Sequence, residues 1–291
     1  MSEAAQGGGP RLVVVTDLDG SLLDSAGYSA AAARPALAAL ARRRIPLVPC
    51  TSKTLAEVEA LRDLLGAPAP MIVENGGAVV IPAGYFGGDA ARTDSSGDPV
   101  VVPLGVPRAR LVASLAQMAR ETGLRLRGFS AMEPAEVAVL TGLGPDDVTR
   151  AMARDYDEPF VFEEDTGAAQ AVERAAAARG LRCSRGGRFW HLTGQTDKGR
   201  ALRVLLGLFR ARGRVPATVG LGDAENDAPM LLAVDRPILV PRPDGRVEPR
   251  LRRRLPAAEV APAPGPAGWN RAVLALLKSA PRRAPASPRA R

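Results

Sequence analysis

The chain has 291 residues, of which 46% are hydrophobic and 24% are charged, as in an ordinary globular protein with a sizeable core. No apolar run reaches the roughly 18 residues that a membrane span requires. Residues 1–10 are small and polar and lack the pattern of a signal peptide. We therefore predict a cytoplasmic protein without a membrane partner.

The net charge of +8 raises nucleic-acid binding as an alternative. Eight arginines account for this excess, in one cluster and one Pro/Ala-rich tail: Arg250, Arg252, Arg253, Arg254, Arg282, Arg283, Arg289 and Arg291. No aromatic-rich stacking surface accompanies them, as single-strand binding would require. We predict solvated surface, disorder over residues 1–10 and 280–291, and no nucleic-acid partner. Steeply salt-dependent DNA binding without residues 281–291 would revive the alternative.

Lysine and asparagine are rare in this arginine-rich chain, with three of each. They are Lys53, Lys198 and Lys278, and Asn75, Asn226 and Asn270. A chemical need is a reasonable hypothesis where such a chain retains a lysine or an asparagine.

The first third of the chain alternates between strand and helix patterns. Short apolar runs at 12–16, 45–50 and 71–73 predict buried strands, and residues 29–43 and 54–65 predict helices. Thr54 and Glu57 form a capping-box pattern at the second helix. This βαβαβ order predicts a doubly wound, mainly parallel sheet.

The middle of the chain has α+β character, and the βα order returns after it. Helices are predicted at 107–123, 134–143, 145–154 and 166–179, a strand at 160–162, and a hairpin at 181–184 and 188–192. Later elements are helix 197–212, strand 217–221, helix 228–234, strand 237–240, a Pro/Gly-rich connector at 261–268 and helix 268–279. We assign residues 11–83 and 187–279 to an α/β core and residues 84–186 to an inserted domain.

Two acidic loops follow predicted buried strands. The first contains Asp17, Asp19 and Ser21, and the second is Gly-Asp-Ala-Glu-Asn-Asp at 222–227, with Asp223 as its first carboxylate. Ligands of open α/β sheets bind beyond the carboxyl ends of the strands. Neighbouring carboxylates repel unless a cation lies between them, and hard oxygen ligands suit Mg²⁺. Asp-rich or helix-capping turns are the alternative interpretation of each loop.

Two residues between these loops are candidates for binding phosphate. Thr51 ends the second predicted strand, and Lys198 begins a predicted helix. A hydroxyl can bond a phosphate oxygen, and an ammonium can offset the charge of a transferring phosphoryl group. Taken singly, Thr51 could equally be a cap, and Lys198 a surface lysine.

These four segments, in this order, resemble the haloacid dehalogenase (HAD) superfamily over about residues 11–275. The resemblance implies a Rossmann-like core in which Asp17 is the nucleophile and Asp19 the general acid/base. It implies that phosphate is bound by Ser21, Thr51, Ser52 and Lys198. It also implies that Mg²⁺ is bound by Asp17, the Asp19 backbone carbonyl and Asp223, and that Asn226 and Asp227 support this metal site. Ser21 stands where the family usually has Thr, which keeps the hydroxyl.

The insertion between Thr51 and Lys198 resembles the α+β cap (C2B type) of HAD subclass IIB. Five segments are similar to the mannosyl-3-phosphoglycerate phosphatase family: Pro-Cys-Thr-Ser-Lys-Thr at 49–54, Ile-Val-Glu-Asn-Gly-Gly at 72–77, Arg-Asp-Tyr-Asp-Glu at 154–158, Gly-Gly-Arg-Phe-Trp-His at 186–191 and Pro-Ala-Pro-Gly-Pro at 262–266. The resemblance implies a Mg²⁺-dependent phosphatase, monomeric or homodimeric, that hydrolyses mannosyl-3-phosphoglycerate or its glucosyl analogue in compatible-solute biosynthesis.

The substrate of such an enzyme would meet the cap, where a guanidinium fork and neutral hydrogen bonders suit a glycerate carboxylate and a sugar. The candidates are Glu74, Asn75, Arg154, Arg188, His191 and Thr193. Arg188 could instead be a solvated hairpin residue and His191 a structural one, and the Glu-Asn-Gly-Gly turn could serve turn geometry alone. The alternatives for function are another subclass IIB phosphatase, acting on sucrose-phosphate or hexose-phosphate, and, more weakly, a phosphomutase.

Overall fold

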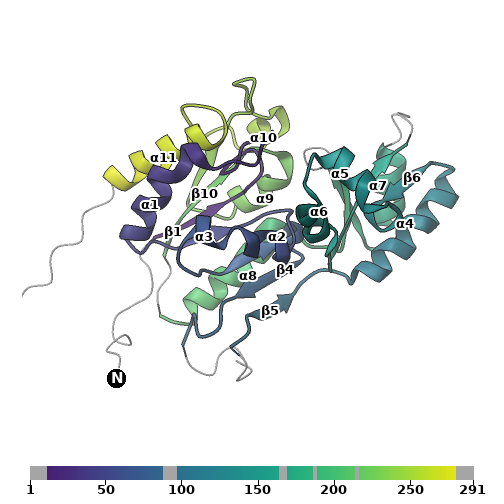
Figure 1. The fold of residues 1–291 in the computed structure, drawn as a ribbon, viewed down its shortest axis with the longest axis horizontal. Coiled ribbons are helices and arrows are strands. Elements are labelled where there is room, and N and C mark those ends of the chain that lie inside the picture. Colours follow the sequence, from purple (N-terminus) through teal and green to yellow (C-terminus); the bar gives the residue numbers. More distant parts are fainter. Residues whose placement is uncertain (1–11, 88–96, 164–168, 186–188, 214–215, 280–291) are drawn as a thin grey trace, which may run out of the picture.

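The computed structural model describes residues 12–87, 97–163, 169–185, 189–213 and 216–279 (Figure 1). Its largest sheet has five parallel strands in the order β12-β11-β10-β1-β2. The strands are β1 (Leu12–Thr16), β2 (Leu47–Pro49), β10 (Ala217–Gly222), β11 (Arg236–Leu239) and β12 (Glu259–Val260). The predicted α/β class with a mainly parallel sheet is confirmed.

Helices cover both faces of this sheet (Figure 1). One face carries α1 (Arg34–Arg42) and α11 (Gly265–Ser279), and the other carries α8 (Lys198–Arg210), α9 (Ala228–Leu231) and α10 (Pro249–Arg254). Successive side chains of a strand point to opposite faces, so a strand buried on both sides is apolar throughout. This requirement explains the continuous apolar run in β1.

A three-stranded antiparallel sheet lies beside β2. It contains β3 (Met71–Val73), β4 (Ala78–Ile81) and β5 (Val100–Pro103), and an isolated bridge joins Ile72 to Cys50. The short helical segments before and within this region are η1 (Ala31–Ala33), α2 (Leu55–Ala60), α3 (Arg62–Leu65) and η2 (Glu74–Gly76). The capping box predicted at Thr54 and Glu57 is present at the start of α2.

The inserted domain is built on a four-stranded antiparallel sheet in the order β6-β7-β9-β8. Its strands are β6 (Leu126–Gly128), β7 (Asp157–Phe162), β8 (Arg182–Arg185) and β9 (Trp190–Thr193). Its helices are α4 (Arg108–Thr122), η3 (Phe129–Ala131), α5 (Pro134–Thr141), α6 (Pro145–Met152) and α7 (Ala169–Ala177). Two separate apolar clusters, around Phe160 and around Phe129, fill this domain.

Strand pairing moves both predicted domain boundaries. The strand at 100–103 pairs with β4, so this part of the predicted insertion extends the sheet beside β2. The strand at 190–193, predicted for the core, pairs with β7 and β8 and belongs to the insertion. The chain therefore leaves the core after residue 103 and returns after residue 193. Partners far apart in sequence decide both boundaries, and local patterns do not reveal them.

Other local predictions differ from the structure in smaller ways. The helix predicted at 54–65 is divided at Leu61, and the predicted connector at 261–268 already contains the first turn of α11. The helix α10 and the strand β12 were not predicted, and three arginines of the basic cluster lie in the last turn of α10. The segments 1–10 and 280–291, predicted to be disordered, lie outside the described residues.

None of the helices in the described ranges has the length and apolar character required to cross a lipid bilayer.

Candidate active site

The centre of the site is a buried lysine held between two buried aspartates. Lys198 Nζ donates to Asp17 Oδ1 at 2.6 Å and to Asp227 Oδ1 at 2.6 Å. The side chains of Lys198 and Asp227 are almost completely enclosed, and 9% of the Asp17 side chain is exposed. Three sequence segments that are up to 210 residues apart thus meet at one edge of the parallel sheet.

The backbone around Asp17 explains how these groups converge. Thr16 of β1 lies opposite Leu221 of β10, and the Asp17 amide donates to the Leu221 carbonyl at 2.9 Å. Both loops therefore leave the same edge of the sheet. Gly20 has a φ of +84°, and a Cβ atom there would lie 2.6 Å from Asp223 Oδ2. Glycine is required because it permits both the left-handed backbone and the close approach of the two loops.

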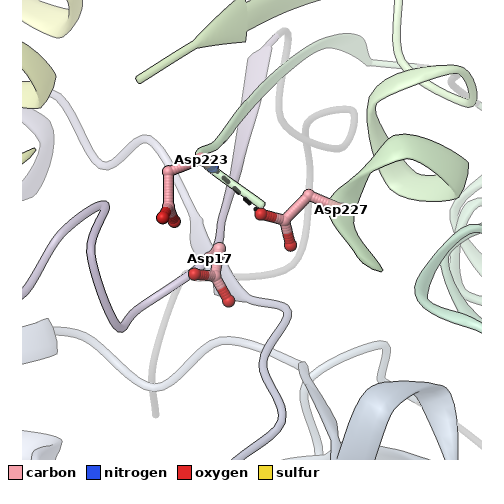
Figure 2. A group of neighbouring side chains, drawn as sticks. All are labelled: Asp17, Asp223 and Asp227. Atoms are coloured by element: carbon pink, nitrogen blue, oxygen red, sulfur yellow. Dashed lines mark hydrogen bonds between the residues drawn. The ribbon is translucent and has the colours of Figure 1, made fainter. Parts of the chain in front are cut away.

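Asp223 and Asp227 complete a group of three carboxylates with Asp17 (Figure 2). One oxygen from each lies within 4.8 Å of the others. Ser21 Oγ donates to Asp223 Oδ1 at 3.0 Å, and Asp227 Oδ2 accepts from the backbone amides of Asp223 and Ala224, each at 3.0 Å. Asp227 therefore braces the loop that carries Asp223.

Electrostatics in this group favour a bound cation. Burial and the neighbouring charge of Asp227 raise the pKa of Asp17 well above its usual value. Burial, together with the charge of Asp227, raises the pKa of Asp223 to about 7. Burial alone would lower the pKa of Lys198, but the charges of Asp17 and Asp227 outweigh it and raise this pKa. One ammonium does not balance three clustered carboxylates.

The donor set fits Mg²⁺, which prefers hard carboxylate, carbonyl and water oxygens. Both carboxylate oxygens of Asp227 already accept hydrogen bonds, whereas Asp17 and Asp223 each have remaining acceptor capacity. Asn226 Oδ1 is buried and has no hydrogen-bond partner among the described residues. The residues present are thus compatible with a divalent cation beside Asp17 and Asp223.

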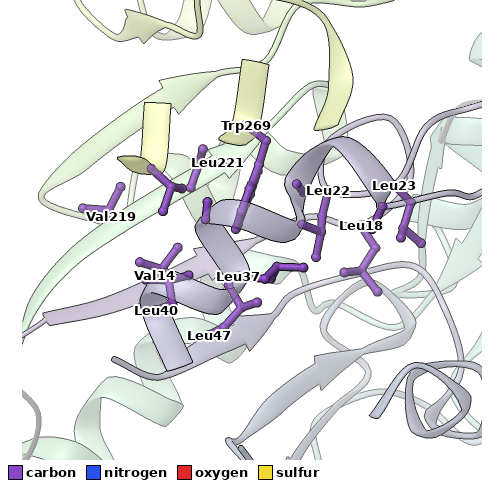
Figure 3. Packing of buried hydrophobic residues seen from close by; sticks show 14 of the residues in the cluster. Val14, Leu18, Leu22, Leu23, Leu37, Leu40, Leu47, Val219, Leu221 and Trp269 are labelled. Atoms are coloured by element: carbon purple, nitrogen blue, oxygen red, sulfur yellow. The ribbon is translucent and has the colours of Figure 1, made fainter. Parts of the chain in front are cut away.

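The strand β1, which ends directly before Asp17, packs against α11 (Figure 3). Trp269, which is fully buried, packs in the same cluster as Val14 and Leu40. Its Nε1 donates to Thr16 Oγ1 at 2.9 Å, and Thr16 Oγ1 donates to the Asp17 carbonyl at 2.7 Å. The backbone of Asp17 is therefore held by the last helix as well as by the sheet.

Asp19 lies at the more open side of the loop, with 35% of its side chain exposed. Its Oδ1 is 3.1 Å from Lys53 Nζ. Thr51 is fully buried, and its Oγ1 accepts from the Lys53 amide at 3.1 Å. Ser52 is half-buried, and its carbonyl accepts from Arg154 Nη1 at 3.0 Å. The predicted phosphate-binding segment therefore also contacts the insertion.

Two substrate candidates of the insertion, Arg154 and His191, surround the carboxylate of Asp157. Asp157 Oδ2 lies 2.7 Å from His191 Nδ1 and 3.3 Å from Arg154 Nη1, and it accepts from Asn75 Nδ2 at 3.0 Å. Burial alone would raise the pKa of Asp157, but the contacts with His191, Arg154 and Asn75 outweigh it and lower this pKa. Asn75 Oδ1 in turn accepts from Asn226 Nδ2 at 3.1 Å. A hydrogen-bonded chain thus joins the insertion to the second acidic loop.

Glu74 also connects the core to the insertion. Its carboxylate accepts from the backbone amides of Asp155, at 3.0 Å, and Tyr156, at 2.8 Å. Glu74 and Asn75 both have positive φ, 48° and 56°, and their side chains contact residues 155–157 at the start of β7. Burial raises the pKa of Glu74 to about 7.

Thr193, the remaining described candidate of the insertion, lines a small cavity beside Lys198. Arg182 and Ser184 of β8 line the same cavity, together with core residues Asn75, Thr196, Asp197, Lys198 and Asn226. Arg182 Nη1 pairs with Asp197 Oδ2 at 3.0 Å. The sequence reasoning missed Arg182 and Ser184, although their alternation in a predicted hairpin could have marked a shared face. Arg188 lies outside the described residues.

Curated relatives match nearly the whole chain. A glucosyl-3-phosphoglycerate/mannosyl-3-phosphoglycerate phosphatase of Methanococcoides burtonii is 40% identical over 265 residues, covering 91% of this chain and 97% of that protein. The chain belongs to the mannosyl-3-phosphoglycerate phosphatase family. A second member, a mannosyl-3-phosphoglycerate phosphatase of Pyrococcus horikoshii, is 32% identical over 229 residues, covering 78% of this chain and 90% of that protein.

The wider relationships of this mannosyl-3-phosphoglycerate phosphatase family member agree with its fold. Residues 14–85 match the haloacid dehalogenase-like hydrolase family. A solved HAD subclass IIB sugar phosphatase aligns with a TM-score of 0.61 at 12% identity, covering 91% of this chain and 98% of that one. A protein of Thermoplasma acidophilum aligns with a TM-score of 0.64 at 19% identity, covering 92% and 98%. The protein is therefore a HAD-type phosphatase, a phosphoric monoester hydrolase, and its insertion is a cap.

Proposed function

We propose that this phosphatase hydrolyses mannosyl-3-phosphoglycerate, and also glucosyl-3-phosphoglycerate, to the glycosylglycerate and phosphate. The observation that carries this proposal is the 40% identity, over nearly the whole chain, to an enzyme named for both substrates. The site supports the same chemistry, because a carboxylate can receive a phosphoryl group while the buried ammonium beside it offsets the negative charge. As in the family, the expected role is cytoplasmic synthesis of a compatible solute.

In the first step, a carboxylate oxygen of Asp17 attacks phosphorus in line with the departing glycerate oxygen. The new bond joins Asp17 to phosphorus, and the ester P–O bond breaks, which forms an aspartyl-phosphate. Asp19, two residues along the same loop and partly exposed, donates a proton to the departing oxygen. Lys198, already bonded to Asp17, offsets negative charge on the transferring group.

In the second step, Asp19 accepts a proton from a water molecule that attacks the aspartyl-phosphate. The bond between phosphorus and Asp17 breaks, and inorganic phosphate leaves. Ser21, Thr51 and Ser52 are the candidate hydrogen-bonding groups for the phosphoryl oxygens. Ser21 follows β1, and Thr51 and Ser52 follow β2, so all three lie beyond the carboxyl ends of neighbouring strands. Such positioning, fixed by buried strands, limits reorganisation during the reaction.

Mg²⁺ would be held by Asp17, the Asp19 backbone carbonyl and Asp223, with Asn226 and Asp227 supporting the loop. When bound, the cation supplies charge stabilisation for the phosphoryl oxygens. Asp227 contributes through its hydrogen bonds to the backbone amides of residues 223 and 224. Asn226 contributes through its hydrogen bond to Asn75.

The leaving group would lie towards the cavity between β8, β9 and the start of α8. Arg182 is the candidate to bind the glycerate carboxylate, since a guanidinium fork matches a carboxylate. Ser184 and Thr193 are candidates for neutral hydrogen bonds to the sugar or glycerate hydroxyls. Arg154 and His191 instead serve the cap–core junction through Asp157.

A phosphate-release panel tests the substrate. Mannosyl-3-phosphoglycerate, glucosyl-3-phosphoglycerate, sucrose-6-phosphate and hexose phosphates are compared by kcat/KM, with and without Mg²⁺. We expect the two glycosyl-3-phosphoglycerates to exceed the other substrates by at least about 100-fold, since unpaired polar groups strongly discriminate between substrates. Preference for sucrose-6-phosphate or a hexose phosphate would overturn the proposed substrate. Conversion of a hexose 1-phosphate to its 6-phosphate without phosphate release would indicate a phosphomutase.

A further inference from the structure

Lys53 is the second buried lysine of the active site, and the steps above give it no role. Of the three lysines in the chain, Lys198 contacts Asp17, and Lys278 is exposed on α11. Lys53 is buried and lies between the end of β2 and the start of α2. Burial of an ammonium is costly unless it is paired, so its partners indicate what it does.

Three groups surround the Lys53 ammonium. Nζ lies 3.3 Å from Glu57 Oε1, 3.1 Å from Asp19 Oδ1 and 4.7 Å from the centre of the Tyr28 ring. Burial alone would lower the pKa of Lys53, but the charges of Asp19 and Glu57 outweigh it and raise this pKa. The buried ammonium is therefore paired with two carboxylates and one aromatic ring.

Two of these three partners are fixed by other contacts. Glu57 Oε2 accepts from the Thr54 amide at 2.9 Å, and the Glu57 amide donates to Thr54 Oγ1 at 3.1 Å, which closes the capping box of α2. Tyr28 lies in a turn organised by the Asp24 carboxylate, which accepts from the backbone amides of residues 26, 27 and 29. The position of Lys53 is thus fixed by contacts that do not involve Asp19.

Asp19 is more exposed than either of the other two charged members of the cluster. More than a third of its side chain is exposed, against 9% for Glu57 and 10% for Lys53. Its Oδ1 is buried, and it meets Lys53 Nζ in an ion pair at 3.1 Å. The ion pair therefore holds Oδ1 in the interior, while about a third of the Asp19 side chain stays exposed.

We propose that Lys53 is a positioning residue for Asp19, holding its carboxyl at the site where it exchanges a proton with the leaving oxygen and with water. The Glu57 capping box and the Tyr28 ring hold Lys53 itself. The inference rests on the proposed role of Asp19 and on no particular sugar. A compact ammonium fits this enclosed position beside two carboxylates better than the longer planar guanidinium, which explains a lysine in an arginine-rich chain.

The test separates loss of proton transfer from loss of structure. Lys53→Met is compared with the wild type on two substrates: the alkyl phosphate that the wild type hydrolyses fastest, and p-nitrophenyl phosphate. The ratio kcat/KM reports the steps up to alcohol release. An alkoxide needs a proton as the P–O bond breaks, whereas p-nitrophenolate leaves as a stable anion, so only the first substrate depends on Asp19 placement at this stage.

We expect Lys53→Met to lower kcat/KM for the alkyl phosphate by about 30-fold or more, since misplacement of a catalytic group by 1 Å can cost about 100-fold in rate. For p-nitrophenyl phosphate, whose leaving group needs no proton, we expect a loss in kcat/KM of less than about 3-fold. Lys278→Met is the matched control and leaves both values unchanged. If Lys53→Met does not fold by circular dichroism, Lys53→Gln is measured in the same way. Equal losses on both substrates, or no loss, in the folded variant would overturn the proposal.

The substrate comparison also keeps this inference separate from the proposed function. If the panel rejects mannosyl-3-phosphoglycerate, the Lys53 test still applies to the alkyl phosphate that the wild type prefers. A selective effect with another substrate would then support the role of Lys53 while refuting the substrate assignment.

Discussion

The core site and the cap face differ in how their polar residues are used. In the core, Asp17, Lys198 and Asp223 come from loops that follow strands or begin a helix, and they converge at one sheet edge. In the cap, Arg154 and His191 are drawn towards Asp157 and away from solvent. Polar residues that directly follow a strand thus lie where the sequence pattern predicts them. Polar residues of the cap sheet instead form hydrogen bonds and ion pairs with neighbouring cap residues, which the sequence pattern does not predict.

The largest expected effect tests the core side of this comparison. Asp17→Asn removes the proposed nucleophile and should lower kcat by more than about 10⁴-fold, because covalent catalysis would be lost. Circular dichroism should show an unchanged fold. Asp244→Asn, in an exposed turn, is the matched control and should retain full activity. Activity of Asp17→Asn within 10-fold of the wild type would refute the nucleophile assignment.

Replacement of the buried Lys198 should have the next largest effect, in this case on the free energy of unfolding. Lys198→Met leaves Asp17 and Asp227 buried without their shared partner. Breaking a buried ion pair costs about 3–5 kcal/mol. We expect a loss of this size in the free energy of unfolding, measured by denaturant titration in the presence of a metal chelator. The control Lys278→Met should change it by less than about 0.5 kcal/mol, and an equal change in both would contradict the buried-pair interpretation.

Two cap variants distinguish a junction residue from a substrate residue. His191→Asn loses its contact with Asp157 and should lower the free energy of unfolding by about 2–3 kcal/mol with little change in KM. Arg182→Met removes a partly exposed ion pair, so it should cost less than about 1 kcal/mol while raising KM for an acid-bearing substrate about 10-fold. The opposite pattern would assign substrate binding to His191 and a structural role to Arg182.

The smallest effect concerns pH and the junction carboxylate Glu74. Burial raises its folded-state pKa from 4.5 to about 7. The folded protein therefore binds the proton more tightly than the unfolded chain does. This contribution to stability is fully present below pH 4.5 and is lost as pH rises through 7. We expect Glu74→Gln to reduce the stability loss between pH 5 and pH 8 by roughly 1–2 kcal/mol, measured by denaturant unfolding with a chelator. If the free energy of unfolding depends on pH equally in the variant and the wild type, Glu74 is not the group responsible.

The core could be predicted from the sequence because its signals are local. An apolar run followed by Asp17 or by Asp223 marks a strand end, and parallel strand ends share one sheet edge. The capping box at Thr54 is likewise complete within four residues. These features depend on the chain nearby and on general rules of sheet geometry, so they needed no knowledge of distant partners.

The cap could not be predicted in the same way, since its arrangement depends on distant strand pairing. The contact of His191 with Asp157 exists because β9 pairs with β7, and Arg182 reaches the cavity because β8 pairs with β9. Lys53 was notable in the sequence only for its rarity. Its relation to Asp19 required the turn that brings two loops together. The domain boundaries were misplaced for the same reason.

The link between Trp269 and Thr16 has a consequence for the order of folding during synthesis. The strand β1, which leads into Asp17, is made first, but its neighbour β10 follows about 200 residues later, and Trp269 later still. While the ribosome is translating the cap, β1 lacks both of these partners. Asp17 therefore reaches its final setting only after α11 has emerged. A nascent chain that stops before α11 should be inactive, even though both acidic loops have already been made.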